Sequence, residues 1–251
     1  MNKIAIVTGA TSGIGEATAL KLAENNFDII ITGRRKERLI ELKNKIIKNN
    51  KVRVLELCFD VRNRNEVSEN LGNLPSDWKN IDVLVNNAGL AVGLNPIQNG
   101  ETDDWERMID TNIKGLLYIT RTISPTMVER QTGHIINIGS IAGKEVYPNG
   151  NVYCATKHAV DALSKAMRID MYQHNIKVTA IHPGMVETEF SVVRFHGNQE
   201  KADNVYEGFT PLFADDIAEA ILFAVTRPAH VNINDMLIMP TAQANGTLVK
   251  K

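Results

Sequence analysis

Cysteines and long apolar runs are both scarce in this chain of 251 residues, which holds only Cys58 and Cys154. Two cysteines cannot build the disulfide framework of a small secreted protein, so we expect two reduced core thiols and a cytoplasmic location. No apolar run approaches the ~20 residues that cross a bilayer, and the run at 4–7 is too short for a signal peptide. The sequence therefore predicts neither a membrane anchor nor secretion.

An excess of charge of one sign is also missing. The chain carries 28 Lys and Arg against 29 Asp and Glu, a net charge of −1. No strong field therefore exists to gather nucleic acid or an anionic membrane. Hydrophobic residues make up 43% and charged residues 23%, which is ordinary for globular proteins and unlike disordered ones. The expected partner is a small-molecule substrate.

Two familiar kinds of catalytic site have no counterpart in the sequence. The six histidines lack metal-ligand spacing and have no cysteine pair beside them, so we expect no metal site. The Gly-x-Ser-x-Gly turn of α/β-hydrolases is not present either. The chemistry must therefore be sought in other patterns.

Short apolar, β-branched runs alternate with longer helical patterns along the chain. Most of the runs are continuously apolar, as in strands covered on both faces. The alternation predicts an α/β fold with a doubly wound, parallel, seven-stranded sheet in a single Rossmann-type domain over 1–251. The expected strands lie at 4–7, 28–32, 52–59, 81–85, 134–138, 177–182 and 236–239. The expected helices lie at about 14–26, 35–49, 63–72, 103–130, 153–174 and 214–226. The segment 187–213 fits neither pattern and predicts a substrate loop, or else a surface insertion.

A glycine-rich turn follows the first expected strand and opens the first expected helix. It reads Thr-Gly-Ala-Thr-Ser-Gly-Ile-Gly over 8–15. In this context glycines let the backbone approach a pyrophosphate, and the helix N-terminus offers free N–H groups. We therefore expect dinucleotide binding rather than a plain tight turn. The expected contact residues are Gly9, Thr11, Ser12, Gly13, Ile14 and Gly15.

The end of the second expected strand selects between the two nicotinamide dinucleotides. An NAD-binding chain places an acidic residue there for the ribose 2′-hydroxyl, but this chain has Arg34 and Arg35. Planar guanidinium groups suit a 2′-phosphate, so the expected cofactor is NADP(H). The alternative is that both arginines are merely solvated at the start of the next helix.

Two further strand ends fit the same ligand, because ligands of open α/β sheets lie beyond the carboxyl ends of the strands. Asp60 and Val61 follow the third expected strand, and we expect them at the adenine. Asn87, Ala88 and Gly89 follow the fourth expected strand, and we expect them at a cofactor ribose.

Ser140, Tyr153 and Lys157 form a candidate catalytic set. Ser140 follows the fifth expected strand, and the other two residues lie four apart on one face of a helix. A nearby ammonium lowers the pKa of a phenol and so makes a tyrosine a better acid–base catalyst at neutral pH. Ser140 can donate a hydrogen bond to a substrate carbonyl. Because Tyr-x-x-x-Lys also occurs by chance, the prediction rests on its conjunction with the glycine turn, Asn86–Gly89 and Asn112.

With these motifs in this order, the chain resembles the short-chain dehydrogenase/reductase family over essentially its whole length. The resemblance implies that Ser140 binds the substrate oxygen and that Tyr153 transfers the proton. It implies that Lys157 binds the nicotinamide ribose and lowers the tyrosine pKa, and that Asn112 holds a water that relays protons to the lysine. It also implies that the segment after the sixth strand closes over the nicotinamide, with Thr188 on its carboxamide. The cofactor contacts expected there are Pro183, Gly184, Val186 and Thr188.

Several stretches recur together in one group of that family, the NADP-dependent 3-hydroxy acid dehydrogenases. They include 33–39, 60–64, 187–195 and 228–234. The resemblance implies hydride transfer between the nicotinamide and the 3-hydroxyl carbon of small 3-hydroxy acids. Such acids include serine, L-allo-threonine and 3-hydroxypropionate, whose oxidation gives malonic semialdehyde. The resemblance also implies a homotetramer.

Two other functions stay open. One is a carbonyl reductase of another small ketone, diketone or aldehyde. The other is a non-catalytic NADPH-binding sensor, which would need neither Tyr153 nor Lys157.

Arg194 is the candidate residue for recognition of an acid substrate. It lies in the segment 187–213 and can pair with a substrate carboxylate. The alternative, a solvated loop arginine, is equally consistent with the sequence.

Overall fold

The apolar runs form one seven-stranded sheet in the computed structural model of the chain, which describes residues 2–251. Neighbouring strands are parallel, and their order is β3-β2-β1-β4-β5-β6-β9. From β1 the chain adds β2 and β3 on one side of the sheet and then returns to add β4 and the later strands on the other side. This change of side between β1 and β4 creates a crevice at their carboxyl ends. The strands of this sheet are β1 (Ile4–Val7), β2 (Asp28–Gly33), β3 (Val54–Cys58), β4 (Ile81–Asn86), β5 (Gly133–Ile138), β6 (Ile176–Pro183) and β9 (Asp235–Ile238).

Helices link these strands and cover both faces of the sheet. They are α1 (Gly13–Glu24), α2 (Lys36–Asn49), α3 (Arg64–Gly72), α4 (Thr102–Ile109), α5 (Leu116–Arg130), α6 (Asn151–Met171), α7 (Phe190–Arg194), α8 (Gln199–Asp203) and α9 (Ala214–Val225). Within the described residues, none of the helices has the length and apolar character that a membrane span requires.

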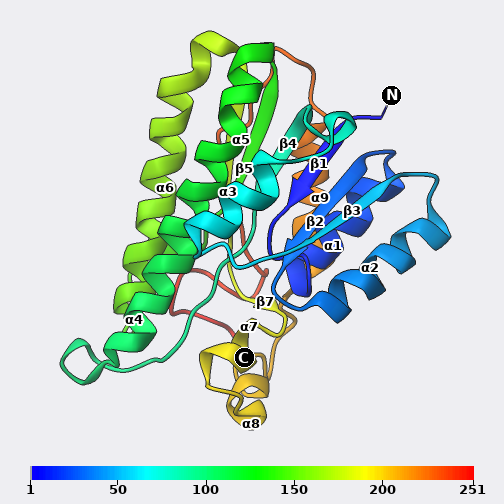
Figure 1. Cartoon of the computed structure of the whole chain (residues 1–251). Helices are drawn as coiled ribbons and strands as arrows, with labels where there is room; N and C mark the ends of the chain where they lie inside the picture. The colour runs from blue at the N-terminus through cyan, green and yellow to red at the C-terminus, as the bar shows by residue number, and fades with distance from the viewer. Residues whose placement is uncertain (1) are drawn as a thin grey trace.

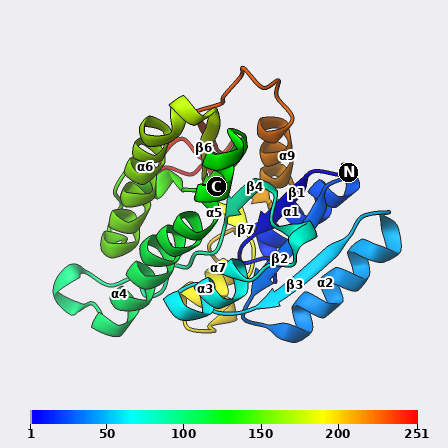
Figure 2. The same cartoon turned by 45° about the horizontal axis from the view of Figure 1, so that its top comes forward.

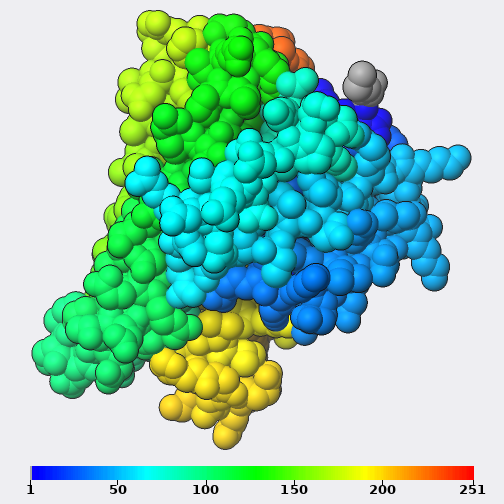
Figure 3. All heavy atoms as spheres, in the orientation of Figure 1, coloured from blue at the N-terminus to red at the C-terminus, as the bar shows by residue number. Residues whose placement is uncertain are grey.

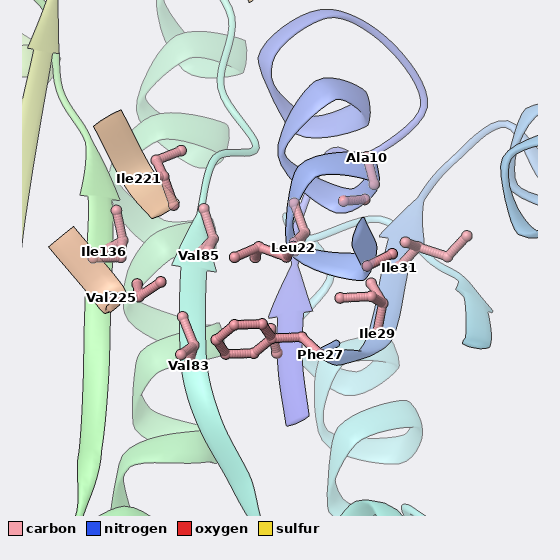
Figure 4. Close-up of a cluster of buried hydrophobic side chains, with 14 of the residues drawn as sticks. Ala10, Leu22, Phe27, Ile29, Ile31, Val83, Val85, Ile136, Ile221 and Val225 are labelled. Carbon is pink, nitrogen blue, oxygen red and sulfur yellow. The ribbon is translucent and has the colours of Figure 1, made fainter. Parts of the chain in front are cut away.

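Two apolar layers hold the sheet between the helices. Successive strand residues point to opposite faces, so Ala5 and Val7 of β1 pack with α1, α2 and α9, whereas Ile4 and Ile6 pack with α3, α5 and α6. Figures 1 and 2 show the two sets of helices on opposite sides of the sheet. Figure 4 shows the first layer, where side chains of β2, β4 and β5 meet Leu22 of α1 on one side and residues of α9 on the other. The predicted fold class is confirmed.

The helix expected at 103–130 is divided. A π-helical stretch, Asp110–Gly115, separates α4 from α5. It holds Asn112, whose side chain bonds the backbone of Leu90, and such stretches are frequent at functional sites. An apolar repeat along the sequence does not reveal this change, because the helix continues on both sides.

The segment 187–213 is not a structureless loop. It contains α7 and α8, and its two ends pair as β7 (Val186–Glu187) with β8 (Leu212–Phe213). Helices of five residues are too short to show an apolar period, so the sequence does not predict them. Figure 3 shows this segment, in yellow, projecting from one end of the molecule.

The two cysteines differ in their surroundings. Cys154 is buried in α6, as expected, but Cys58 is exposed. The expectation of two core thiols is therefore wrong for Cys58, because this residue ends β3, the strand at the edge of the sheet.

Candidate active site

A cavity of about 370 Å³ opens at the carboxyl ends of β1, β2, β4 and β5. It gathers residues that lie far apart in the chain. Of the predicted site residues, Gly15, Asn112 and Arg194 are not in its walls. The predicted residues that line it are Gly9, Thr11, Ser12, Gly13, Ile14, Arg34, Arg35, Asp60, Val61, Asn87, Ala88, Gly89, Ser140, Tyr153, Lys157, Pro183, Gly184, Val186 and Thr188.

The glycine turn at one end of the cavity has a backbone that side chains would block. Gly9 and Gly13 have φ values of +66° and +54°, in the left-handed region that favours glycine. A Cβ atom on Gly15 would lie 2.3 Å from the Gly9 carbonyl oxygen. Because α1 begins at Gly13, its free N–H groups face this turn. The turn therefore fits a dinucleotide pyrophosphate.

Arg35 binds the glycine turn directly. Its guanidinium donates hydrogen bonds to the Thr11 carbonyl oxygen at 3.1 Å and to Ser12 Oγ at 2.8 Å. It also donates to the Glu189 carboxylate at 2.8 Å. Arg34 lies 3.7 Å from the Asp60 carboxylate, and its side chain is 58% exposed. Both guanidinium groups thus stand at the rim of the cavity, and their binding of a 2′-phosphate stays a prediction.

Asp60 is held by basic neighbours rather than free in the cavity. Arg62 Nη2 lies 2.6 Å from its carboxylate, and hydrogen bonds from Arg62 lower the pKa of Asp60 against the opposing effect of burial. The Asp60 carboxylate therefore stays charged and fixed beside the predicted adenine position.

Asn87 joins the end of β4 to the glycine turn. Its Nδ2 donates to the Thr8 carbonyl oxygen at 2.8 Å, and Thr8 Oγ1 accepts from the backbone N–H groups of Asn87 and Ala88, each at 3.0 Å. The side chain thus fixes the two walls of the crevice against each other, in addition to lining it.

Ser140, Tyr153 and Lys157 meet at the other end of the cavity, as predicted. Ser140 Oγ accepts a hydrogen bond from the Ala142 N–H at 3.1 Å. Lys157 Nζ lies 5.9 Å from the centre of the Tyr153 ring and donates to the Ile138 carbonyl oxygen at 2.9 Å. All three side chains are buried.

Burial dominates the titration of this set. It raises the pKa of Tyr153, and the Tyr147 phenol adds to the rise, while a hydrogen bond from Ser140 and the charge of Arg194 oppose it. Burial also lowers the pKa of Lys157 to about 8. Lys157 is not among the groups that shift the Tyr153 pKa in this structure, so its expected lowering of that pKa stays a prediction.

Asn112 donates both amide protons to protein groups, and its Oδ1 accepts one hydrogen bond. Its Oδ1 accepts from the Leu90 N–H at 2.8 Å, and its Nδ2 donates to the Leu90 carbonyl oxygen at 2.8 Å and to Thr156 Oγ1 at 3.0 Å. It therefore ties the chain after β4 to α6, the helix that carries Tyr153.

Arg194 lies beside the tyrosines of the site. Its guanidinium carbon is 5.6 Å from the centre of the Tyr153 ring, and its Nη2 donates to the Tyr147 hydroxyl at 2.9 Å. Within the described residues, its buried Nε has no hydrogen-bond partner. The side chain is half-buried, and its role as an anchor for a substrate carboxylate stays a prediction.

Sequence reasoning gave no role to several residues that contact the predicted site residues, among them Glu189, Tyr147 and His182. Glu189 pairs with Arg35, Tyr147 with Arg194, and His182 contacts the Ser140 backbone. Tyr147 has one signal in the sequence, since it lies in the stretch between Ser140 and Tyr153. Glu189 lies in the stretch 187–195, which carries the resemblance, but neither it nor His182 has a signal for its partner, because the partners are distant in the chain.

Comparisons with known proteins agree with this geometry. The short chain dehydrogenase family matches residues 3–199. The NADP-dependent 3-hydroxy acid dehydrogenase YdfG of Salmonella typhimurium is 52% identical over 242 residues, 96% of each protein. Sulfoacetaldehyde reductase 2 of Chromohalobacter salexigens is 44% identical over 245 residues, 97% of this chain and 96% of that protein. The closed form of serine dehydrogenase with NADP+ is 47% identical, with a TM-score of 0.94 over 99% of each chain. The chain belongs to the short chain dehydrogenase family.

Proposed function

We propose that the protein is an NADP-dependent oxidoreductase that interconverts small 3-hydroxy acids and the corresponding carbonyl compounds. The observation that carries the proposal is one cavity that joins the glycine turn and two arginines to Ser140, Tyr153 and Lys157. NADP+ supplies the hydride acceptor when bound. Relatives that are 47–52% identical bear the names of an NADP-dependent 3-hydroxy acid dehydrogenase and a serine dehydrogenase.

The protein's own residues handle the substrate oxygen and its proton. Ser140 donates a hydrogen bond to that oxygen and thereby orients the carbon that bears it. The Tyr153 phenolate accepts the hydroxyl proton in oxidation, and the phenol returns it in reduction. Phe190, whose ring centre lies 5.7 Å from that of Tyr153, covers the tyrosine from the segment after β6 and helps to exclude water.

Arg194 supports an anionic substrate. Its charge lies beside Tyr153, and its Nε is a buried donor without a partner in the described chain. A bound carboxylate would satisfy this donor, as charge-assisted pairs of arginine do. The names of the relatives agree with an anion, since one contains a 3-hydroxy acid and another a sulfonated aldehyde.

A second candidate is the reduction of a small aldehyde that carries a sulfonate. The 44% identical sulfoacetaldehyde reductase favours it, and the same guanidinium would bind the sulfonate. The two candidates share the site and differ only in the anion, so a substrate panel separates them.

The deciding experiment measures NADP+ reduction with L-serine, L-allo-threonine, 3-hydroxypropionate and 3-hydroxyisobutyrate, and NADPH oxidation with sulfoacetaldehyde. A parallel series uses NAD+. We expect turnover of the 3-hydroxy acids with NADP+ and little with NAD+. Turnover of neutral ketones alone would make the protein a carbonyl reductase of another class. Tight NADPH binding with no turnover of any substrate would favour the sensor instead.

We further propose a cytoplasmic homotetramer. The resemblance supports the tetramer, as do exposed apolar side chains on and beside the long helices, Leu117 on α5 and Ile169 and Tyr172 at the end of α6. Two unpaired cysteines support a reducing compartment. Light scattering on the eluting protein tests the assembly, because a mass of about 28 kDa, the 27.8 kDa of one chain, would contradict it.

A further inference from the structure

We propose that His182 is a positioning residue that holds the backbone of Ser140 in place for the reaction. This inference rests on the proposed function, because it concerns the serine that binds the substrate oxygen. His182 lies near the end of β6, and its side chain is completely buried. The cavity walls do not include it, so it acts through Ser140 rather than on the substrate.

The imidazole ring lies directly against the chain that leads to Ser140. His182 Nδ1 is 3.3 Å from the Ser140 carbonyl oxygen. A Cβ atom on Gly139 would lie 2.4 Å from the same nitrogen, so the ring occupies the space that any side chain at 139 would need. The Gly139 N–H also donates to the Ile181 carbonyl oxygen at 2.7 Å. The turn at 139–140 is thereby fixed from β6.

A carbonyl oxygen only accepts hydrogen bonds, so the contact requires the proton on Nδ1. Burial lowers the pKa of His182 below its usual value of 6.5, and the charge of Lys144 acts in the same direction against the opposing Asp235 and Asp161. The ring is therefore neutral at pH 7, and the contact with Ser140 selects the tautomer that carries its proton on Nδ1.

The other ring nitrogen faces a charged cluster formed by Lys144, Asp161 and Asp235. His182 Nε2 lies 3.2 Å from Asp235 and 3.6 Å from Asp161, and the described residues give it no hydrogen-bond partner. Lys144 Nζ lies 2.9 Å from the Asp161 carboxylate and 2.8 Å from that of Asp235. A histidine and two carboxylates are a plausible ligand set for a cation, but the ammonium already takes that place.

This cluster encloses the far side of the ring with groups from three elements. Asp161 comes from α6, Asp235 from β9, and Lys144 follows the short turn of 3₁₀ helix that begins after Ser140. Lys165 Nζ lies 2.7 Å from Asp161, and Arg168 is the further charge near the two carboxylates. In the Nδ1–H tautomer Nε2 carries a lone pair and no proton, so it makes no hydrogen bond to the carboxylates. The cluster encloses the ring, and the contact with the Ser140 carbonyl is the hydrogen bond that sets its orientation.

The position of the Ser140 hydroxyl depends on this backbone. Its Oγ accepts from the Ala142 N–H, two residues further on, and the same side chain lowers the pKa of the Tyr153 phenol. Displacing the carbonyl displaces Oγ relative to the tyrosine. A shift of about 1 Å in a reacting group can cost about a hundredfold in rate.

The test compares His182→Leu, which keeps the bulk and loses the donor, with His182→Asn, whose Nδ2 is bonded to Cγ as Nδ1 is. Both are made in the full chain and in the Ser140→Ala background, and kcat, KM and Tm are measured with NADP+ and a 3-hydroxy acid. We expect His182→Leu to lower kcat about ten- to a hundredfold, with KM for NADP+ changed by less than about threefold. Asn should restore kcat to within about fivefold of the wild type. In the Ser140→Ala background, adding His182→Leu should lower kcat by less than about twofold relative to Ser140→Ala alone.

Three results would overturn the inference. They are an unchanged kcat in His182→Leu, a loss in His182→Asn as large as that in Leu, and an equal loss with and without the serine hydroxyl. If the leucine variant does not fold, the asparagine variant in the two backgrounds decides. An inactive wild type would instead overturn the proposed function, and this inference with it.

Discussion

The Arg35 guanidinium donates to the Glu189 carboxylate across 2.8 Å and thereby joins the glycine turn to the segment that follows β6. Arg38 lies 3.3 Å from the same carboxylate. Hydrogen bonding from Arg35 lowers the pKa of Glu189, so the group is charged at neutral pH. A negative charge therefore stands where the proposed function places the 2′-phosphate of NADP(H).

Neutralising Glu189 should tighten the binding of NADP+. The carboxylate and Arg35 are each 44% exposed, and an exposed ion pair of this kind contributes only about 0.2–1 kcal/mol. We therefore expect Glu189→Gln to lower the Kd for NADP+ by about 1.4- to fivefold, measured by fluorescence titration. The Kd for NAD+, which has no 2′-phosphate, should not change. Arg35→Ala is the matched control and should weaken NADP+ binding alone. Equal changes for both dinucleotides would show that Glu189 does not compete with the phosphate.

The parts of the molecule that the sequence predicts well are those that depend on neighbours in the chain. Apolar runs such as 28–32 mark buried strands, and the glycine turn carries its own backbone requirement. The pairs that the sequence does not reveal join residues far apart: Arg35 and Glu189 are separated by 154 positions, and Tyr147 and Arg194 by 47. Either partner alone is an ordinary polar side chain, so only the folded chain shows the pair.

The pKa values of Tyr153 and Lys157 are a second property that the sequence alone does not predict. The spacing of Tyr153 and Lys157 predicts that they share a helix face, and both lie on α6 and line the same cavity. It does not predict how deeply both are buried, and burial determines their pKa values here. Charge proximity and desolvation oppose each other for a buried phenol, and the depth of burial is a property of the whole fold.

The pH dependence should follow the state of Tyr153. Burial raises the pKa of this phenol above its usual value of 10.0, so the free enzyme holds the protonated form at neutral pH. Oxidation needs the phenolate and reduction needs the phenol. We therefore expect kcat/KM for oxidation to rise with pH up to at least about 10, with a slope near one in a log plot. The value for reduction should stay flat over the same range. Tyr153→Phe should lose both activities while keeping NADP+ binding, and retained turnover would contradict the proposed role.

Glycine at position 15 should be indispensable for the turn. An alanine methyl group there would lie 2.3 Å from the Gly9 carbonyl oxygen and 2.5 Å from Asn87 Nδ2, so backbone would have to move. We expect Gly15→Ala to cost about 1–3 kcal/mol of stability and to weaken NADP+ binding more than about tenfold. Gly72→Ala is the matched control, since no atom lies within 4 Å of that added carbon. A normal Tm and normal cofactor binding in Gly15→Ala would refute the tight turn.

Arg194 should distinguish acids from neutral alcohols. Its guanidinium carbon lies 5.6 Å from the centre of the Tyr153 ring. The guanidinium is held there by the hydrogen bond of 2.9 Å that it donates to the Tyr147 hydroxyl. Loss of a charge-assisted hydrogen bond costs about 1.5–3 kcal/mol, so Arg194→Ala should lower kcat/KM for 3-hydroxy acids by about ten- to a hundredfold. Neutral alcohols of similar size lack the carboxylate and should lose much less. Tyr147→Phe keeps the ring and removes the hydroxyl, so it should produce a smaller loss with the same preference for acids. An equal loss on acids and neutral alcohols in Arg194→Ala would mean that the arginine supports the Tyr153 pocket rather than a substrate anion.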